Sequence, residues 1–221
     1  AMQHSTRSTD FFGTEIMTRN IYANYRSVMS LRRAKAQLTH SSDVPVFGLV
    51  YTVDFDWDLM YFGWALNNML GQATWEMTGH HCPADKSNYR LFTTEKGNID
   101  LRESKLVSKI ALLFSLQSRD WPRFTSYFPD VLGISQLLNL QHIPHVFINE
   151  FALNAERLSN YEVLIVSNSM ALSDNDIAAI RAFAEQGGRV YLSNRVACYN
   201  ENGDKRDNWP FADLIPLDID V

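Results

Sequence analysis

The stretch Lys109–Trp121, KIALLFSLQSRDW, decides how the whole chain is interpreted. Five apolar residues in succession, Ile110–Phe114, follow a lysine and predict a strand buried on both faces. We interpret Ser115–Asp120 as a polar turn. An aromatic cluster comes next, at Trp121, Phe124, Tyr127 and Phe128. Because strands and helices alternate from here onward, the stretch predicts the first strand of a second domain.

Downstream of this stretch the same alternation continues. Further strands are predicted at His145–Asn149, Tyr161–Ser167 and Arg189–Ser193. A helix is expected from Pro129 to His142, and a short one from Ala155 to Asn160. The first of these helices has apolar residues on or near one face, at Val131, Ile134, Leu137, Leu138 and Leu140. The pattern predicts an α/β fold with a flavodoxin-like, doubly wound parallel sheet.

The helix expected between Ser173 and Gly187 has sequence signals at both of its ends. Ser173 is expected to be its N-cap, with Asp176 completing a capping box. Leu172 and Ile177 occupy the two positions of a hydrophobic staple. The pair Gly187–Gly188 is expected to end the helix, as glycine commonly does.

The first hundred residues have a different pattern of predicted strands and helices. Strands are predicted at Asp10–Met17, Val44–Val53 and Gln72–Met77, with helices at Tyr22–Leu38 and Leu59–Leu70 between them. Three strands are few for a sheet with two hydrophobic edges, so this region looks like the last βα units of a TIM-type (β/α)8 barrel. We expect the barrel part and a linker in residues 1–103, and the second domain in residues 104–221.

Composition limits the classes of function. A hydrophobic fraction of 46% and a charged fraction of 20% are globular values. The net charge of −5 does not indicate a basic surface of the kind that binds nucleic acid. The sequence contains no run of about 18 apolar residues, so no membrane span is predicted. Two distant cysteines, Cys82 and Cys198, predict no disulfide framework. We therefore expect a cytoplasmic protein without nucleic-acid or membrane partners.

The segments VSNSMALSDNDIAAIRAFAEQGGRVYLSN (166–194) and SKIALLFSLQSRDW (108–121) carry a family resemblance. Together they resemble the trimerisation domain of the β-galactosidases of glycoside hydrolase family 42 and their degenerate relatives. That fold is shared with the class I glutamine amidotransferases. The resemblance implies a barrel followed by a trimerisation domain, a β-linked carbohydrate as substrate, and a homotrimer.

The resemblance also implies where the catalytic carboxylates stand. In the family the acid/base follows the fourth barrel strand, which would lie upstream of Ala1. The nucleophile ends the seventh strand, but the apparent seventh strand, Val46–Thr52, contains no glutamate. Its end carries Tyr51 and Thr52 instead. The chain alone is therefore expected to lack the complete catalytic pair.

Three carboxylates are nevertheless candidate catalytic residues. Glu15 and Glu76 end predicted strands, and Asp54 lies just past another, where barrel enzymes place their chemistry. The alternative is that each is a solvated strand-end or capping carboxylate. Tyr51 and Trp57 are the candidate substrate-binding residues. Trp64 and Trp75 would extend a sugar-stacking platform, with core packing as their alternative role.

The second domain offers little chemistry of its own. The turn after its third strand, Ser167–Ala171, contains no cysteine nucleophile, and no histidine follows His145. No phosphate-binding glycine loop is present, so no cofactor is expected. His80-His81-Cys82 lacks a second ligand cluster, so no metal is expected.

An assembly role is therefore the better prediction for this domain. Aromatic and arginine side chains are enriched in interface hot spots. The candidate interface comprises Arg119, Trp121, Arg123 and Phe124. The alternative is that the aromatic residues only cover the edge of the sheet.

Two hypotheses of different classes follow. The first is the C-terminal part of a β-galactosidase-like glycoside hydrolase, in which the second domain serves subunit assembly. The second is a non-catalytic interaction or carbohydrate-binding module. A third, an amidotransferase-like enzyme, is disfavoured by the missing cysteine.

Overall fold

The computed structural model describes residues 12–17, 46–51, 64–65, 73–77, 107–121 and 123–215. The chain divides into two compact units, Ala1–Leu106 and Val107–Val221. Each unit is described by itself. The first has few described residues, whereas the second is described almost throughout.

The described part of the first unit is a three-stranded parallel sheet. Its strands are β1 (Phe12–Met17), β2 (Val46–Tyr51) and β3 (Ala73–Met77), in the order β1-β2-β3. All three strands were predicted, and the structure confirms them. The predicted helix at Tyr22–Leu38 lies outside the described residues, and of the helix at Leu59–Leu70 only residues 64–65 are described, as helical.

The second unit is built on a four-stranded parallel sheet. The strands are β4 (Ile110–Leu113), β5 (Val146–Ile148), β6 (Val163–Ser167) and β7 (Arg189–Ser193). Their order across the sheet is β5-β4-β6-β7, and every neighbouring pair is parallel. The α/β class is therefore confirmed, as are the four predicted strands.

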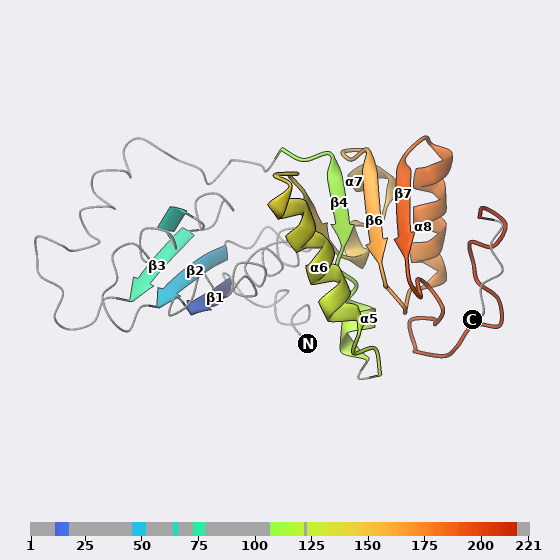
Figure 1. The fold of residues 1–221 in the computed structure, drawn as a ribbon, viewed down its shortest axis with the longest axis horizontal. Helices are drawn as coiled ribbons and strands as arrows, with labels where there is room; N and C mark the ends of the chain where they lie inside the picture. The colour runs from blue at the N-terminus through green and yellow to red at the C-terminus, as the bar shows by residue number, and fades with distance from the viewer. Residues whose placement is uncertain are drawn as a thin grey trace, which may run out of the picture. The chain divides into compact units, whose positions relative to one another are not determined.

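Helices cover both faces of this sheet. Figure 1 shows α6 (Tyr127–Leu140) in front of the strands and α7 (Ala155–Leu158) behind them, with α8 (Asp174–Glu185) beside β7. The short helix α5 (Leu116–Asp120) follows β4, and a 3-10 turn, η3 (Glu150–Ala152), follows β5. This layering lets the sheet bury apolar side chains on both faces.

The strand register divides the core into two parts. On one face Leu112 is level with Phe147 and with Ile165. This face packs under α6, where the Phe114 ring lies 5.9 Å from the Tyr127 ring and 6.1 Å from the Phe147 ring. The opposite face packs against α7 and α8 in one apolar cluster. Its members include Leu113, Ile148, Leu164, Val166, Ile177, Ile180, Phe183 and Phe211.

Two local expectations were wrong. Ser115–Asp120 is not merely a polar turn, because Ser115 accepts a hydrogen bond from the Ser118 N–H and starts the helix α5. In α6 the apolar face was misplaced: Leu137 and Leu140 are 55% and 67% exposed. The residues that α6 buries are Tyr127, Val131 and Ser135. These three are spaced four apart, but one of them is a serine, which hid the stripe from a search for apolar periodicity.

The helix α8 begins and ends as predicted. Ser173 accepts from the Asp176 N–H, and Asp176 in turn accepts from the Ser173 N–H, which completes the capping box. Gly187 has φ of +94°, in the region that favours glycine at a helix C-terminus. A Cβ atom on Gly188 would lie 2.4 Å from the Phe183 ring, so the close return of the chain requires a glycine there.

Candidate functional site at the carboxyl edge of the four-stranded sheet

Each strand of the four-stranded sheet is followed by polar residues at its carboxyl end. Ser115 follows β4, Asn149 follows β5, Asn168 and Ser169 follow β6, and Asn194 follows β7. All but Asn194 are at most 1% exposed. Open parallel sheets bind their ligands at this edge, where the chain switches from one side of the first strand to the other. The edge is therefore the place to look for chemistry in this unit.

Hydrogen bonds within the chain close this edge. The Ser118 hydroxyl donates to the Ala171 carbonyl at 3.2 Å and accepts from the Ala171 N–H at 3.0 Å. Ser115 and Ser118 are completely buried, and so is Ala171. The segment after β6 is thus fastened to α5 at the carboxyl edge of the sheet.

Glu150 is the carboxylate of this network. It accepts hydrogen bonds from the Ser115 hydroxyl at 2.7 Å, the Leu116 N–H at 3.1 Å and the Gln117 N–H at 3.2 Å. Burial raises the pKa of Glu150, and these hydrogen bonds oppose that shift. The carboxylate occupies the N-terminus of α5, where a negative charge is favoured. Its geometry is that of a helix-capping group.

Tyr127 lies behind the same network. Its hydroxyl oxygen accepts a hydrogen bond from the Ser115 N–H, and its ring is fully buried. Burial raises the pKa of Tyr127 well above its usual value, and the nearby charge of Glu150 raises it further. Tyr127 is therefore protonated at neutral pH and serves as a packing and hydrogen-bonding group.

The turn after β6 has a left-handed residue in its backbone but no cysteine. Asn168 has φ of +48°, a left-handed conformation that is uncommon for a residue other than glycine. Its amide donates to the Asp130 carboxylate at 2.6 Å and to the Ser126 hydroxyl at 3.1 Å. Asn194, with φ of +63°, donates to the same carboxylate at 3.0 Å. Asp130 thus holds the ends of two neighbouring strands together.

The described residues place no base beside the serine of this turn. Ser169 Oγ is buried next to Tyr127 without a partner of good hydrogen-bond geometry. The nearest histidine in sequence, His145, precedes β5 and so lies at the amino edge of the sheet. Its Nε2 is 2.5 Å from Ser135 Oγ, and its Nδ1 is 3.2 Å from the Ile143 carbonyl. This buried serine–histidine pair was not predicted, because nothing in the local pattern links a residue of a helix with one ten positions later, just before a strand.

Cys198 is a free cysteine and is 5% exposed. Burial raises the pKa of its thiol, so the reactive thiolate is disfavoured. In the described part of the chain no three histidine, cysteine or carboxylate side chains come together to hold a metal ion. His80, His81 and Cys82 lie outside those residues.

The candidate interface residues lie in the last turn of α5 and in the loop that follows it, but they are not equally accessible. Arg123 is exposed, and its guanidinium lies 4.8 Å from the Tyr199 ring, 5.3 Å from Phe124 and 5.7 Å from Trp121. Phe124 is only 5% exposed, because its ring packs 4.8 Å from Tyr199. Arg119 pairs at 2.6 Å with Asp120. The accessible surface here is thus a guanidinium stacked on aromatic rings.

The candidate catalytic residues of the first unit are placed only by their backbone. Glu15 is level with Leu49 in the sheet, and Glu76 is level with Val50. Tyr51 is the last residue of β2. Asp54 and Trp57 lie outside the described residues. The roles assigned to these five residues stay predictions.

No protein-family model matches the chain, and no curated protein matches it either. Solved structures do match. A cold-adapted β-galactosidase from Rahnella sp. R3 has a TM-score of 0.70 at 11% identity, over 97% of this chain and 38% of that one. A catalytic mutant of Gan42B, a GH42 β-galactosidase from G. stearothermophilus, has a TM-score of 0.65 at 10% identity, over 94% of this chain and 36% of that one.

A third match is a GH42 exo-carrageenase from Bacteroides ovatus, with a TM-score of 0.58 at 15% identity, over 80% of this chain and 28% of that one. The chain therefore spans between 28% and 38% of the length of these three structures. At these identities the likeness shows a shared fold. In the described part of the chain, no helix is long and apolar enough to cross a membrane.

Proposed function

We propose that this chain is the C-terminal part of a glycoside hydrolase acting on β-linked sugars, in which the second unit serves subunit assembly. The observation that carries the proposal is the extent of the fold likeness. It covers 97% and 94% of this chain against two β-galactosidases, and so takes in both compact units rather than one widespread domain. A likeness of that extent is expected when two domains are inherited together.

The topology of the second unit supports a flavodoxin-like assignment. Numbered within the unit, its strands lie in the order 2-1-3-4, because β5 pairs outside β4 while β6 and β7 extend the other side. This is the order of the first four strands in the flavodoxin-like doubly wound fold.

An assembly role fits this unit better than catalysis. The carboxyl edge that such sheets use for ligands is closed by Ser115, Ser118 and Glu150. Ser169 has a buried hydroxyl, but His145 belongs to the opposite edge and is already bonded to Ser135. A serine nucleophile requires a base within hydrogen-bond reach, and this edge supplies none among the described residues.

The register of the first unit narrows the catalytic hypothesis. Glu15 is level with Leu49 and Glu76 with Val50, so the two positions differ by one step along the sheet. Positions one step apart belong to opposite faces of a sheet. The two backbone positions therefore belong to opposite faces of this sheet, and the proposal needs only one of the two glutamates at the interior face of a barrel. Under the proposal that glutamate needs a second carboxylate, which lies about 5 Å away in a retaining site, and this chain is expected to lack the complete pair.

The test is a galactose titration followed by the indole NMR signals of the purified chain. Trp57 is the candidate sugar-stacking residue, and its signal is expected to shift saturably. Trp209, which is 8% exposed in the second unit, is the internal control and is expected not to shift. Hydrolysis of nitrophenyl β-D-galactoside by the chain alone is expected to be absent. Turnover abolished by Glu15→Gln would overturn the claim of an incomplete site, and failure of galactose and other β-linked sugars to shift Trp57 would count against a sugar-binding barrel end.

A self-contained interaction module is the second candidate. It is favoured by one observation, that the second unit buries its own two-sided core. Under either candidate we propose a cytoplasmic location for the chain. This part of the proposal is supported by the wide separation of the two cysteines, of which Cys198 is a free thiol.

A further inference from the structure

The outer face of α6 carries no charged residue. Its exposed residues recur at helical spacing and share one side of the helix; they are Pro129, Gly133, Gln136, Leu137 and Leu140. The single charged residue of α6 is Asp130, whose carboxylate accepts hydrogen bonds from Asn168 and Asn194 at the edge of the sheet. A solvent-facing side of a helix normally carries charged residues, so this face has the composition of a contact surface.

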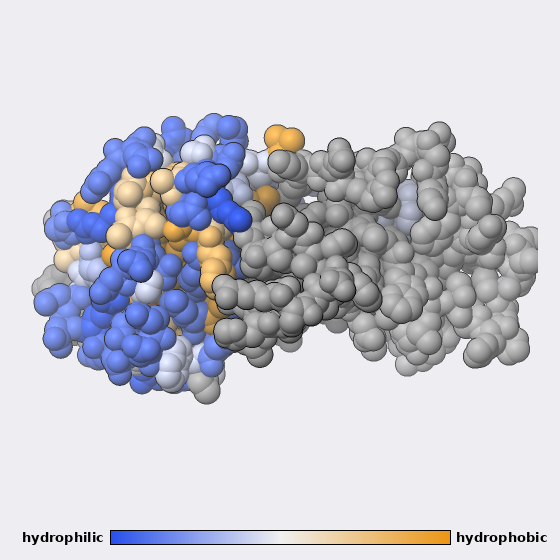
Figure 2. Space-filling view, turned by 180° about the vertical axis from the view of Figure 1, so that it is seen from behind, coloured by the Kyte–Doolittle hydropathy of each residue, from blue (hydrophilic) through white to orange (hydrophobic). Residues whose placement is uncertain are grey.

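The other helices of this unit do present charges to solvent. Asp120 on α5, Glu156 on α7, and Asp174 and Glu185 on α8 are all exposed. In Figure 2 hydrophilic residues cover most of the described surface on the visible side, and apolar residues occupy a smaller area between them. Because the chain has a net charge of −5, two copies approach each other most favourably through uncharged surfaces. The outer face of α6 meets that condition.

Gly133 lies within this face, one helical turn before Leu137. In the structure nothing lies within 4 Å of the position that a Cβ atom on Gly133 would occupy. Glycine in a helix interior lowers helix stability relative to alanine, and no close contact inside the described part of the chain requires it here. Its effect is to leave open space beside Leu137, so that another surface can approach the helix closely around that side chain.

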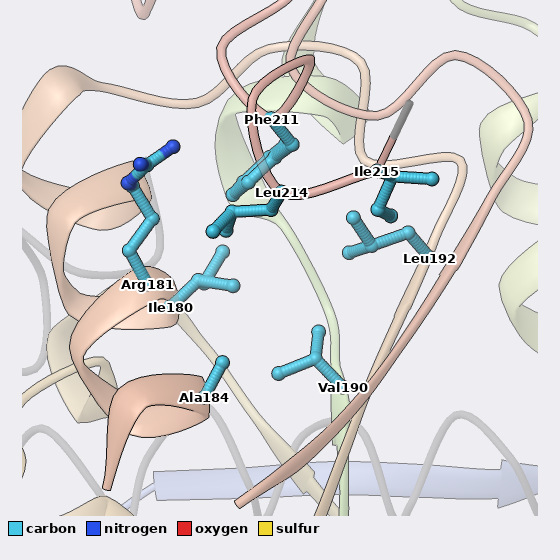
Figure 3. Close-up of a pocket in the computed structure, with 8 residues that line it drawn as sticks. All are labelled: Ile180, Arg181, Ala184, Val190, Leu192, Phe211, Leu214 and Ile215. Carbon is cyan, nitrogen blue, oxygen red and sulfur yellow. The ribbon is translucent and has the colours of Figure 1, made fainter. Parts of the chain in front are cut away.

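The same unit has an apolar pocket of about 170 Å³ in another layer, between α8 and β7. Figure 3 shows the lining side chains around an open centre, with α8 on one side, β7 on the other and the chain after residue 210 above. The lining includes Ile180, Ala184, Val190, Leu192, Leu214 and Ile215. Arg181 also borders the pocket, but its guanidinium donates to the Asp213 carboxylate at 2.8 Å, which compensates its charge. The pocket therefore suits an uncharged, apolar occupant.

The α6 face and the pocket complement each other in shape and polarity. An apolar cavity of about 150 Å³ holds a molecule as large as benzene, so a pocket of about 170 Å³ has room for a leucine side chain. Leu137 is 55% exposed and projects from α6 beside the open space at Gly133. In a cyclic trimer the contacts are head to tail, so two different surfaces of the same chain meet. The unit supplies one projecting and one hollow apolar surface, as such a contact requires.

We propose that copies of this chain associate head to tail, with Leu137 on α6 of one copy inserted into the pocket between α8 and β7 of the next. This inference rests on the assembly role proposed above and names the two surfaces that perform it. The insertion removes an exposed leucine and the pocket lining from water, which supplies hydrophobic stabilisation. Gly133 permits the rim of the pocket to approach the helix around Leu137.

Charge substitutions on the two surfaces test the proposal in sedimentation experiments on the 221-residue chain. Leu137→Glu places a charge on the projecting side chain, and Leu214→Glu places one at the pocket. Each is expected to weaken association at least about tenfold. Phe151→Glu, in the segment between β5 and α7, is the matched control and is expected to associate like the unmodified chain. Leu137, Leu214 and Phe151 are 55%, 45% and 49% exposed, so all three variants are expected to fold, as circular dichroism will show.

Gly133→Gln is a second variant of the α6 face that does not depend on a buried charge. Glutamine favours the helix more than glycine and extends into open space, so the variant is expected to melt no earlier than the unmodified chain. Its longer side chain nevertheless blocks the approach to Leu137, and association is expected to fall at least about tenfold. Undiminished association of Gly133→Gln and Leu137→Glu would overturn the proposal.

An equimolar mixture of Leu137→Glu and Leu214→Glu distinguishes a head-to-tail contact from a contact between identical surfaces. The first variant retains an intact pocket and the second retains an intact α6 face, so the mixture is expected to form a complex of two chains although neither variant associates alone. A mixture that stays monomeric would overturn the head-to-tail arrangement. If the unmodified chain associates and both variants associate equally well, this inference fails and the assembly role stands; an unmodified chain that is monomeric at every concentration would overturn both.

Discussion

The Glu150 carboxylate lies 2.7 Å from the Ser115 hydroxyl and joins the ends of two neighbouring strands, β5 and β4. The same carboxylate accepts the first free N–H groups of α5, from Leu116 and Gln117. One side chain thus organises the edge at which a related sheet would bind a ligand. The carboxyl ends of β4 and β5 are therefore held together by hydrogen bonds within the chain.

Replacing Glu150 tests this assignment. Glu150→Gln keeps one acceptor oxygen but turns an amide toward a helix N–H, so at least one hydrogen bond is lost. We expect a loss of about 1–3 kcal/mol in the free energy of unfolding, measured by urea denaturation. Glu156, an exposed carboxylate on α7, is the matched control, and Glu156→Gln is expected to change stability by less than about 0.5 kcal/mol. Equal effects of the two substitutions would contradict the network role.

The pH dependence of stability follows from the raised pKa of Glu150. When the pKa is higher in the folded than in the unfolded state, the folded state binds more protons between the two values, so stability falls as pH rises through that window. The unfolded value is near 4.5. The free energy of unfolding of the unmodified chain, relative to that of Glu150→Gln, should therefore increase as pH falls from 7 toward 4.5. Urea titrations of both proteins at several pH values measure this difference. A difference that decreases toward acid pH would show the opposite shift.

The capping box of α8 gives a prediction of stability alone. Ser173→Ala removes the hydroxyl that accepts from the Asp176 N–H, and an N-cap substitution of this kind costs about 0.5–2 kcal/mol. Ser126 is the control, since it occupies the N-cap of α6 without a side-chain capping bond and its hydroxyl only accepts a hydrogen bond from the Asn168 amide. Ser126→Ala is expected to lower the thermal midpoint by a smaller amount. A larger loss of stability in Ser126→Ala than in Ser173→Ala would contradict the capping role of Ser173 in α8.

The stacked arginine surface gives a prediction for assembly. Arg123→Ala removes the exposed guanidinium that lies over Trp121, Phe124 and Tyr199. If this surface mediates contact between copies, the substitution weakens association about tenfold or more in sedimentation experiments. Arg189→Ala, which removes another exposed arginine, is expected to leave association unchanged. Identical behaviour of the two variants would place the contact elsewhere.

The sequence predicted the elements whose signals are local. The strands β4 and β7 follow from short apolar runs, and α8 follows from Ser173, Asp176 and the glycine pair that ends it. A capping box and a terminal glycine act within one helical turn, so their effect can be deduced from adjacent residues.

The elements that were missed depend on distant partners. Helix α5 has Ser115 as its N-cap, but the N–H groups of Leu116 and Gln117 are bonded by Glu150, which lies more than thirty residues away in sequence. The buried line of α6 includes Ser135, whose polarity is compensated by His145. Neither pairing has a signature in the local sequence, because each exists only after the sheet has formed.

The same reasoning explains what could be predicted of the candidate site. The polar turn after β6 was recognised from Ser167–Ala171, but its left-handed Asn168 and the bond to Asp130 were not. Asparagine is among the few residues that tolerate this conformation, so the sequence permits it without requiring it. The closure of the edge was likewise invisible, since it depends on contacts between Ser118 and Ala171.

The most direct test of the central claim is the mass of the purified chain in solution, measured by light scattering over a wide range of concentrations. A chain of 25.3 kDa that contains an assembly domain is expected to form a trimer, with three times that mass at the higher concentrations. Limited proteolysis of the same sample should leave a resistant core beginning near Val107, where the second compact unit starts. A mass of 25.3 kDa at every concentration would contradict the assembly role and favour a self-contained module.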